Sequence, residues 1–167
     1  TATFTPTSNY KWSDGSTGAK EVKWTIISVL VSIPSQSGTL TYNGSAQTPS
    51  WKNFDNENSS VSVSAKTNAG EYTAIFTLKK GMWTDGTTAA KTIKWTIGRA
   101  TIATVPAQSG TLTYDGNPKT PSWNTAYDSA KMTVSVTAAT NAGTYSATFT
   151  PTSNYKWSDG STGGKTA

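Results

Sequence analysis

The amino-acid sequence predicts an all-β protein made of tandem antiparallel β-sandwiches. Three observations lead to this prediction: a repeat of about seventy-two residues, aromatic residues that recur in register with it, and short alternating segments between turn signals. Charged residues make up only 14% of the chain, while Thr, Ser, Gly and Asn are abundant. This composition favours short strands with polar faces and tight turns over helices.

The repeat divides the chain into three parts. The recurring segments are SGTLTYNG at 37–44 and SGTLTYDG at 109–116, TNAG at 67–70 and 140–143, and the nearly identical stretches 1–18 and 146–163. A period of this length indicates copies of one small domain. We therefore expect the last two strands of an incomplete repeat at 1–27, a complete repeat at 28–98, and a repeat without its last strand at 99–167.

Aromatic residues show which positions form the core. All seven Trp fall on three repeat positions, namely Trp12, Trp83 and Trp157; Trp24 and Trp95; and Trp51 and Trp123. Large aromatic residues dominate the burial energy of a small core, so copies that keep them in register keep the same core. We expect buried stripes at Tyr72, Phe76 and Trp95 in the complete repeat, and at Tyr145 and Phe149 in the last one. Gly81 is one break in the pattern, since Tyr10 and Tyr155 share its position.

The complete repeat can be divided into strands in order. The expected strands are an alternating segment at 29–33, a short one at 40–42 that ends at the Asn43-Gly44 hairpin signal, a kinked one at 49–51, an alternating one at 61–65, a long one at 71–78, and a last one at 93–97 after the Asp85-Gly86 turn. Six or seven strands of this length, with a turn about every ten residues, are typical of an antiparallel sandwich.

One motif in each copy carries a family resemblance. Asn68-Ala69-Gly70-Glu71-Tyr72, with its partner Asn141 to Tyr145, resembles the approach to strand F of immunoglobulin-like domains, where a tyrosine hydroxyl bonds to the preceding turn. With Tyr42-Asn43-Gly44 and Thr48-Pro49, the unit resembles the mostly-bacterial type of immunoglobulin-like repeat. The resemblance implies tandem immunoglobulin-like sandwiches in an extracellular protein: a stalk, spacer or fibre segment of a surface adhesin, filament or virion.

Composition removes several classes of function. The chain has no Cys and no His, which excludes disulfides, thiolate or imidazole metal ligands, and His-based catalysis. The net charge of +5 comes from scattered lysines, whereas nucleic-acid binders concentrate positive charge on one face. No apolar run is long enough for a membrane span. We expect no enzyme, no cofactor and no nucleic-acid partner.

The remaining candidate sites are few. Asp14, Asp85 and Asp159 each precede Gly and are expected in turns, and the oxygen-rich loop 55–58 is expected to be a surface loop rather than a calcium site, because its counterpart 128–131 loses two of the four oxygen-bearing side chains. Trp12, Trp83 and Trp157 precede Asp-Gly turns at strand ends. If they are exposed, they form a sugar-stacking platform for surface polysaccharide; core packing is the favoured alternative.

The two ends of the sequence are mismatched halves of the repeat. Glu21, Val22, Lys23, Trp24, Thr25 and Ile26 match a closing strand, and 99–167 contains no complete counterpart of it. Either the chain is an excerpt of a longer array, which we favour, or this segment of one molecule adds to the open sheet edge of the next. The expected partners in both cases are neighbouring repeats or copies of the chain itself.

Overall fold

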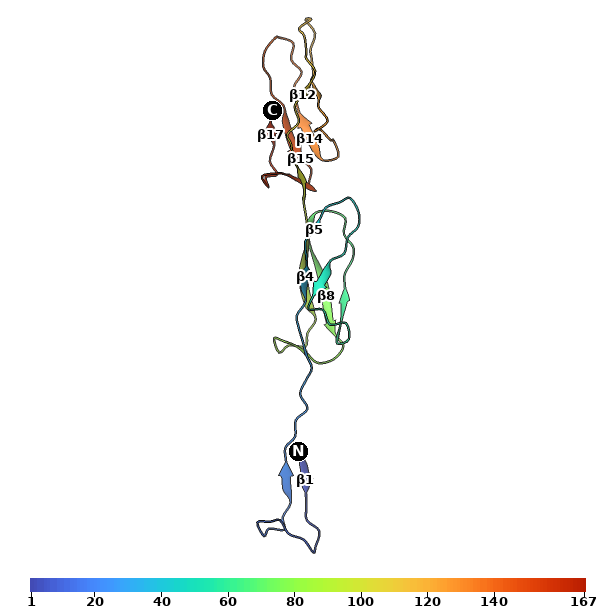
Figure 1. The fold of residues 1–167 in the computed structure, drawn as a ribbon, viewed down its shortest axis with the longest axis vertical. Helices are drawn as coiled ribbons and strands as arrows, with labels where there is room; N and C mark the ends of the chain where they lie inside the picture. The colour runs from blue at the N-terminus through green and yellow to red at the C-terminus, as the bar shows by residue number, and fades with distance from the viewer.

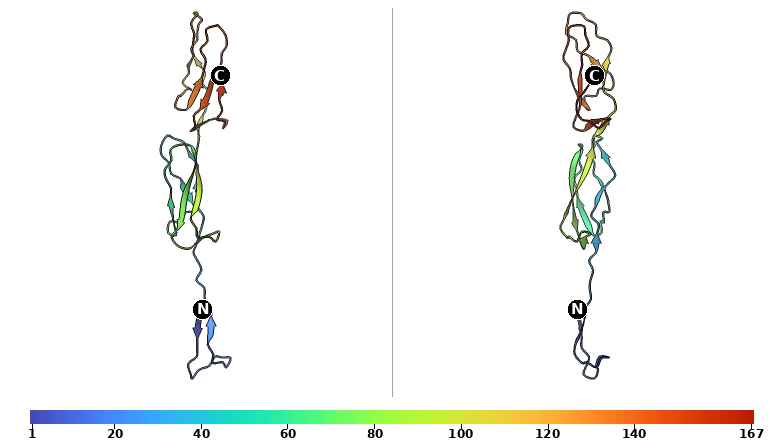
Figure 2. Two further views of the ribbon diagram at one scale, coloured as in Figure 1. Left: turned by 180° about the vertical axis from the view of Figure 1, so that it is seen from behind. Right: turned by 90° about the vertical axis from the view of Figure 1, so that its left-hand side faces the viewer.

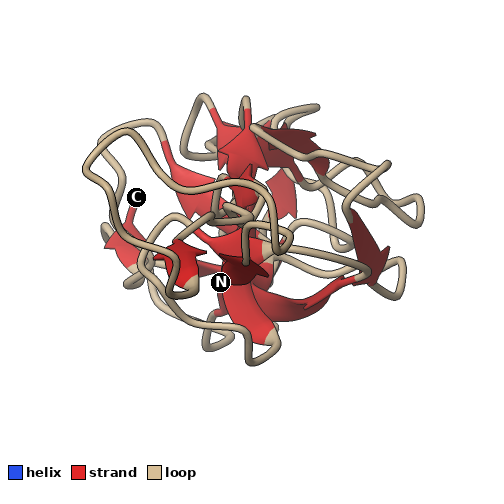
Figure 3. Ribbon diagram, turned by 90° about the horizontal axis from the view of Figure 1, so that it is seen from below, coloured by secondary structure: helices blue, strands red, loops and turns tan.

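The computed structural model describes residues 1–167, and every regular element in it is a β-strand, as predicted. We call residues 1–27 the N-terminal hairpin, 28–98 the central unit and 99–167 the C-terminal unit. The three parts follow one another along a single long axis (Figures 1 and 2). Seen from below, strands and loops alone make up the ribbon (Figure 3). No helix of the structure has the length and apolar character needed to cross a bilayer.

The N-terminal hairpin has two short strands and no core of its own. Strand β1 (Ala2–Phe4) pairs antiparallel with β2 (Lys20–Val22), with Ala2 opposite Val22 and Phe4 opposite Lys20. Phe4 is half exposed and Trp24 is 62% exposed. An isolated two-stranded hairpin is marginally stable in water, because it offers no second layer to bury its apolar face.

The central unit holds eight short strands around one core. They are β3 (Leu30–Val31), β4 (Ser35–Ser37), β5 (Leu40–Thr41), β6 (Ser50–Lys52), β7 (Ser59–Ser62), β8 (Gly70–Leu78), β9 (Met82–Trp83) and β10 (Lys91–Gly98). The main sheet has the order β5-β10-β8-β7, in which β10 is antiparallel to β8 and parallel to β5. The smaller pairs are β3 with β9, parallel, and β4 with β6, antiparallel.

Alternation along β8 and β10 builds the core of the central unit. Ala74 and Phe76 of β8, and Trp95 and Ile97 of β10, are buried, while the residues between them face outward. Trp51 stands edge-on to Phe76 with ring centroids 4.8 Å apart, which joins the β4–β6 pair to the main sheet. The expected buried stripe is thus present in this unit. Tyr72 is half-buried, and its ring centroid lies 5.0 Å from that of Trp95.

The C-terminal unit has a second, separate core. Its strands are β11 (Ala100–Ile102), β12 (Gln108–Ser109), β13 (Ser122–Trp123), β14 (Met132–Ser135), β15 (Thr148–Pro151), β16 (Tyr155–Trp157) and β17 (Lys165–Thr166). They form the sheet β14-β15-β17, the parallel pair β11–β16 and the antiparallel pair β12–β13. The buried residues that form this core are Ile102, Met132, Ala147, Phe149 and Trp157.

One core prediction is wrong. Tyr145 is 57% exposed, although its counterpart Tyr72 is half-buried. The reason is that Tyr72 packs against Trp95 of β10, and no residue of the C-terminal unit occupies the position of Trp95. Two strands differ from the prediction: the opening strand, expected at 29–33, is reduced to β3, and the strand expected at 61–65 is shifted to 59–62 as β7.

Candidate functional site

The joint between the central and C-terminal units is short and bonded to both of them. Strand β10 ends at Gly98 and β11 begins at Ala100, so Arg99 alone separates the two strands. The Ala100 amide donates to the Asn154 carbonyl at 2.9 Å. The Arg99 Nε donates to the Ser153 carbonyl at 2.8 Å. The link is therefore fixed to the turn that precedes β16.

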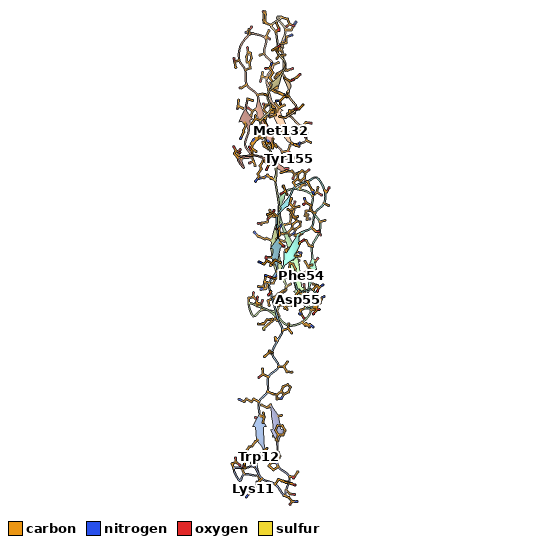
Figure 4. All side chains as sticks on the ribbon, in the orientation of Figure 1. Lys11, Trp12, Phe54, Asp55, Met132 and Tyr155 are labelled. Atoms are coloured by element: carbon orange, nitrogen blue, oxygen red, sulfur yellow. The ribbon has the colours of Figure 1, made fainter.

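Asn154 and Tyr155 extend this joint to the central unit. The Asn154 side chain accepts from the Ala69 amide at 2.8 Å and donates to the Asn68 side-chain oxygen at 3.1 Å. Tyr155, at the lower end of the C-terminal unit (Figure 4), stands edge-on to Tyr42 with ring centroids 5.4 Å apart. One turn thus contacts both the link and the end of the preceding unit.

The short link at Gly98 to Thr101 can be recognised in the sequence, but the contacts of Asn154 and Tyr155 across the joint were not predicted. The available signal was the pair Asn9-Tyr10, which recurs as Asn154-Tyr155 but is replaced by Lys80-Gly81 in the central unit. In the structure the second pair has a folded unit beneath it, whereas Tyr10 of the first is 72% exposed. The central unit is joined to the hairpin by residues 23–29, which lie outside any strand and are all exposed.

The predicted inter-subunit strand lies in and beyond β2. Glu21 and Val22 belong to β2, while the segment from Lys23 to Ile26 has no backbone partner. Its apolar side chains face solvent: Ile26 is 81% exposed and Ile27 is 86% exposed. Apolar residues in such a run are unusual at a free surface and are typical of segments that bind something.

A groove of about 410 Å³ opens in the C-terminal unit. Its apolar lining consists of Leu112, Tyr114, Trp123, Val136, Tyr145 and Ala147 among others. Each of these has a counterpart in the central unit, namely Leu40, Tyr42, Trp51, Val63, Tyr72 and Ala74, and there they pack in the core that contains Trp95 and Ile97. The groove is therefore the place that β10 fills in the central unit.

Two of the three tryptophans before the Asp-Gly turns are closed to a ligand. Trp83 and Trp157 are 0% and 1% exposed, and their indole N–H groups donate to the Ala89 and Gly163 carbonyls, both at 2.8 Å. Trp12 is half-buried and donates to the Gly18 carbonyl at 2.8 Å. A sugar has no access to the indole faces of Trp83 or Trp157, so the stacking platform fails at these two positions.

The aspartates of these turns bind a lysine that sequence reasoning did not pair with them. Asp85 bonds to Lys91 at 2.6 Å and to the Thr87 hydroxyl at 2.7 Å. The Lys91 ammonium, helped by Thr87, lowers the pKa of Asp85 to about 2. The equivalent pairs are Asp14 with Lys20, which also gives Asp14 a pKa of about 2, and Asp159 with Lys165. Each aspartate thus closes its own turn.

The Asp85–Lys91 pair predicts how the central unit responds to acid. A carboxylate whose pKa is lower in the folded chain than in the unfolded one stabilises the fold above the unfolded pKa of about 3.9, and this stabilisation is lost as the pH falls through the folded value. Asp85 should therefore contribute fully at pH 5 and lose its contribution between about pH 4 and 2. The melting temperature should fall less steeply over this range in Asp85→Asn than in the parent chain, and Asp14→Asn is the control. Equal slopes for Asp85→Asn and the parent would contradict the assignment.

In the oxygen-rich loop 55–58, the Asp55 carboxylate is used in hydrogen bonds within the loop itself. The Asp55 carboxylate accepts from the Glu57 amide at 3.0 Å and from the Asn58 side-chain amide at 2.6 Å. These bonds hold the pKa of Asp55 below its ordinary value, with the Asn58 side chain as the main cause. Both carboxylate oxygens of Asp55 therefore already have donors from within the loop.

Comparison of the chain with protein-family models, with curated proteins and with solved structures finds no match.

Proposed function

We propose that the chain is a segment of a non-catalytic extracellular structural protein: a stalk, spacer or fibre segment of a surface adhesin or filament, built from tandem immunoglobulin-like sandwiches. The observation that carries this proposal is the joint at Arg99, Asn154 and Tyr155. It fixes one unit directly onto the end of the next with a single residue between the strands. A link this short, with contacts on both sides, favours a semi-rigid rod over units on a flexible tether.

The tyrosine of each unit supports the immunoglobulin-like assignment. The Tyr72 hydroxyl donates to the Asn68 carbonyl at 2.8 Å, and the Tyr145 hydroxyl donates to the Asn141 carbonyl at 2.9 Å. This is the bond of a tyrosine corner, in which a tyrosine near the start of strand F bonds back to the backbone a few residues upstream. It forms even at Tyr145, where the ring itself is exposed, so it is a property of the local motif.

The state of the aspartates supports a non-catalytic function. All six aspartates have a lowered pKa, and for five of them the first cause is a lysine partner. A general acid at neutral pH needs the opposite shift, which burial or a neighbouring carboxylate produces. These groups are ionised and serve the turns that contain them. An extracellular location follows from the resemblance of the repeat and is part of the proposal.

The rod can be tested by distance measurement across the joint. The chain has no Cys, so Ser60→Cys and Ser129→Cys place one spin label on an exposed position of each unit. Pulsed electron resonance should give one narrow distance distribution. The double variant Asn154→Ala, Tyr155→Gly should broaden it, because it removes the contacts to Asn68, Ala69 and Tyr42.

The matched control for the joint is Asn9→Ala with Tyr10→Gly. This pair has the same sequence position in the N-terminal hairpin, where Tyr10 is exposed. It should leave the distance distribution between the two labels unchanged. A broad distribution in the parent chain would overturn the semi-rigid rod, whatever the variants do.

A further inference from the structure

We propose that Tyr72 positions the joint between the central and C-terminal units, because its hydroxyl group holds the turn 67–69 in the conformation that Asn154 of the next unit binds. The inference deepens the proposed function, on which it rests, by naming the residue that makes the end of the central unit a docking surface for the unit that follows. It is carried by the hydrogen bonds of the turn 67–69, by the space beside Gly70, and by the contact of Tyr72 with β10.

The turn 67–69 has few hydrogen bonds. Before it, Lys66 exchanges two backbone bonds with Gln47, at 2.8 and 2.9 Å, and after it Gly70 begins β8. Between these two anchors, the only hydrogen bonds that reach residues 67–69 come from Tyr72 and Asn154. The conformation of the turn therefore depends on one side chain of its own unit and one of the next unit.

These two side chains bind the same peptide group. The Tyr72 hydroxyl donates to the Asn68 carbonyl at 2.8 Å, and the Asn154 side-chain oxygen accepts from the Ala69 amide at 2.8 Å. The Asn68 carbonyl and the Ala69 N–H belong to one planar peptide bond, so a bond that fixes the carbonyl also fixes the direction of the N–H. Tyr72 thus aims the donor that Asn154 receives.

Gly70 leaves the space that the hydroxyl needs. A Cβ at Gly70 would lie 3.3 Å from the Tyr72 hydroxyl oxygen, closer than an ordinary van der Waals contact, and a Cβ at Gly143 would lie 3.4 Å from that of Tyr145. The same packing recurs in both units, so the local motif builds it without help from a neighbouring unit. The peptide group is therefore oriented before the next unit docks, which lowers the ordering cost of the contact.

Tyr72 also contacts the strand that leads into the link. Its ring centroid lies 5.0 Å from that of Trp95 on β10. Strand β10 ends at Gly98, whose carbonyl accepts from the Tyr42 amide at 2.9 Å, and the Tyr42 ring meets Tyr155 of the next unit. Tyr72→Phe separates these two contacts, because it keeps the ring beside Trp95 and removes only the bond to the turn.

The first test uses spin labels at Ser60→Cys and Ser129→Cys, one on each unit. Tyr72→Phe should still fold, because the ring remains, but it should broaden the distance distribution across the joint. Added to Asn154→Ala, it should broaden the distribution no further than Asn154→Ala alone, because both changes release the same peptide group. Chemical denaturation of each variant will establish that the measurement is made on folded chains.

Tyr145→Phe is the matched control. The Tyr145 hydroxyl donates to the Asn141 carbonyl at 2.9 Å, the same bond in the C-terminal unit, but the turn that contains Asn141 makes no contact with the central unit in the joint. This variant loses an equivalent hydrogen bond, and it should leave the distance distribution as narrow as in the parent chain.

Hydrogen exchange at Ala69 is a second readout. Ala69 and Ala142 lie in identical Thr-Asn-Ala-Gly sequences, so their amides differ in exchange only through the structure. The Ala69 amide donates to Asn154, whereas the Ala142 amide has no acceptor. In the parent chain Ala69 should exchange more slowly than Ala142. In Tyr72→Phe it should exchange several-fold faster than in the parent, and Tyr145→Phe should not change it.

A narrow distribution in folded Tyr72→Phe, or an unchanged Ala69 amide, would overturn the proposal. Either result, with or without a loss of stability, is what a tyrosine that only stabilises its own unit would give. Equal broadening by Tyr145→Phe would also count against it, as would broadening that adds to that of Asn154→Ala. A broad distribution in the parent chain would instead reject the semi-rigid rod itself, and this outcome is distinct because it needs no variant.

Discussion

Phe76→Ala should lower the free energy of unfolding of the central unit by about 3–5 kcal/mol, the usual cost of truncating a buried Phe. Phe76 is fully buried on β8, and Trp51 and Phe54 stand edge-on to its ring with centroids 4.8 and 5.5 Å away. Its removal leaves a cavity that these rings cannot refill without leaving their own positions. Chemical denaturation followed by tryptophan fluorescence will measure the loss.

Phe4→Ala is the matched control for this variant. Phe4 has the same repeat position as Phe76 and the same cross-strand partner, a lysine, but its ring is 52% exposed. Its truncation should change the stability of the central unit by less than about 0.5 kcal/mol, as is usual for surface positions. A loss below about 1 kcal/mol in Phe76→Ala would mean that the ring is not in the core of the folded protein.

The second large effect is expected at Gly81, where Ala should destabilise the central unit by about 2 kcal/mol or more. Gly81 has a φ of 82°, and a Cβ at this position would lie 2.3 Å from the Val29 carbonyl oxygen. That oxygen accepts from the Met82 amide at 2.9 Å, a bond between β9 and the residue that precedes its partner strand β3. An alanine must therefore either adopt a disfavoured backbone conformation against this carbonyl or separate the two strands.

The control for Gly81→Ala is Gly86→Ala. Gly86 has a nearly identical φ of 81° but no atom within 4 Å of its would-be Cβ, so only the conformational cost applies, about 1 kcal/mol. The two variants should differ in thermal or chemical denaturation by about 1 kcal/mol or more. Equal losses would show that β3 and β9 adjust without cost, and would contradict the close approach at Val29.

Gly81 occupies a repeat position that is aromatic in the other two parts of the chain. Tyr10 and Tyr155 share its sequence position, yet neither has a positive φ. The backbone of the central unit has a left-handed conformation here, and it lies close to the Val29 carbonyl. At this position in the C-terminal unit, Tyr155 contacts Tyr42 of the central unit and so contributes to the joint. The central unit is preceded by the extended segment 23–29 and has no equivalent joint.

Much of the fold could be predicted from the sequence because the signals are local. The all-β character follows from period-two alternation in segments such as 71–78 and 93–97, which the structure holds in β8 and β10. The repeat positions of Trp83, Trp95 and Trp157 indicated a core, and all three are buried. Asp before Gly indicated turns at Asp14, Asp85 and Asp159, where side chain and backbone bond within a few residues.

The contacts of the joint and the exposure of Tyr145 were decided only by the tertiary structure, whereas the open sheet edge of the C-terminal unit was predicted from the repeat that lacks its last strand. Asn154 and Tyr155 have the same sequence as Asn9 and Tyr10, and they differ only in having a folded unit beneath them. Tyr145 has the local sequence of Tyr72 and makes the same hydroxyl bond, yet its ring is exposed because no strand lies where β10 lies beside Tyr72. Local patterns determine turns and strands, whereas burial depends on which distant segment packs against them.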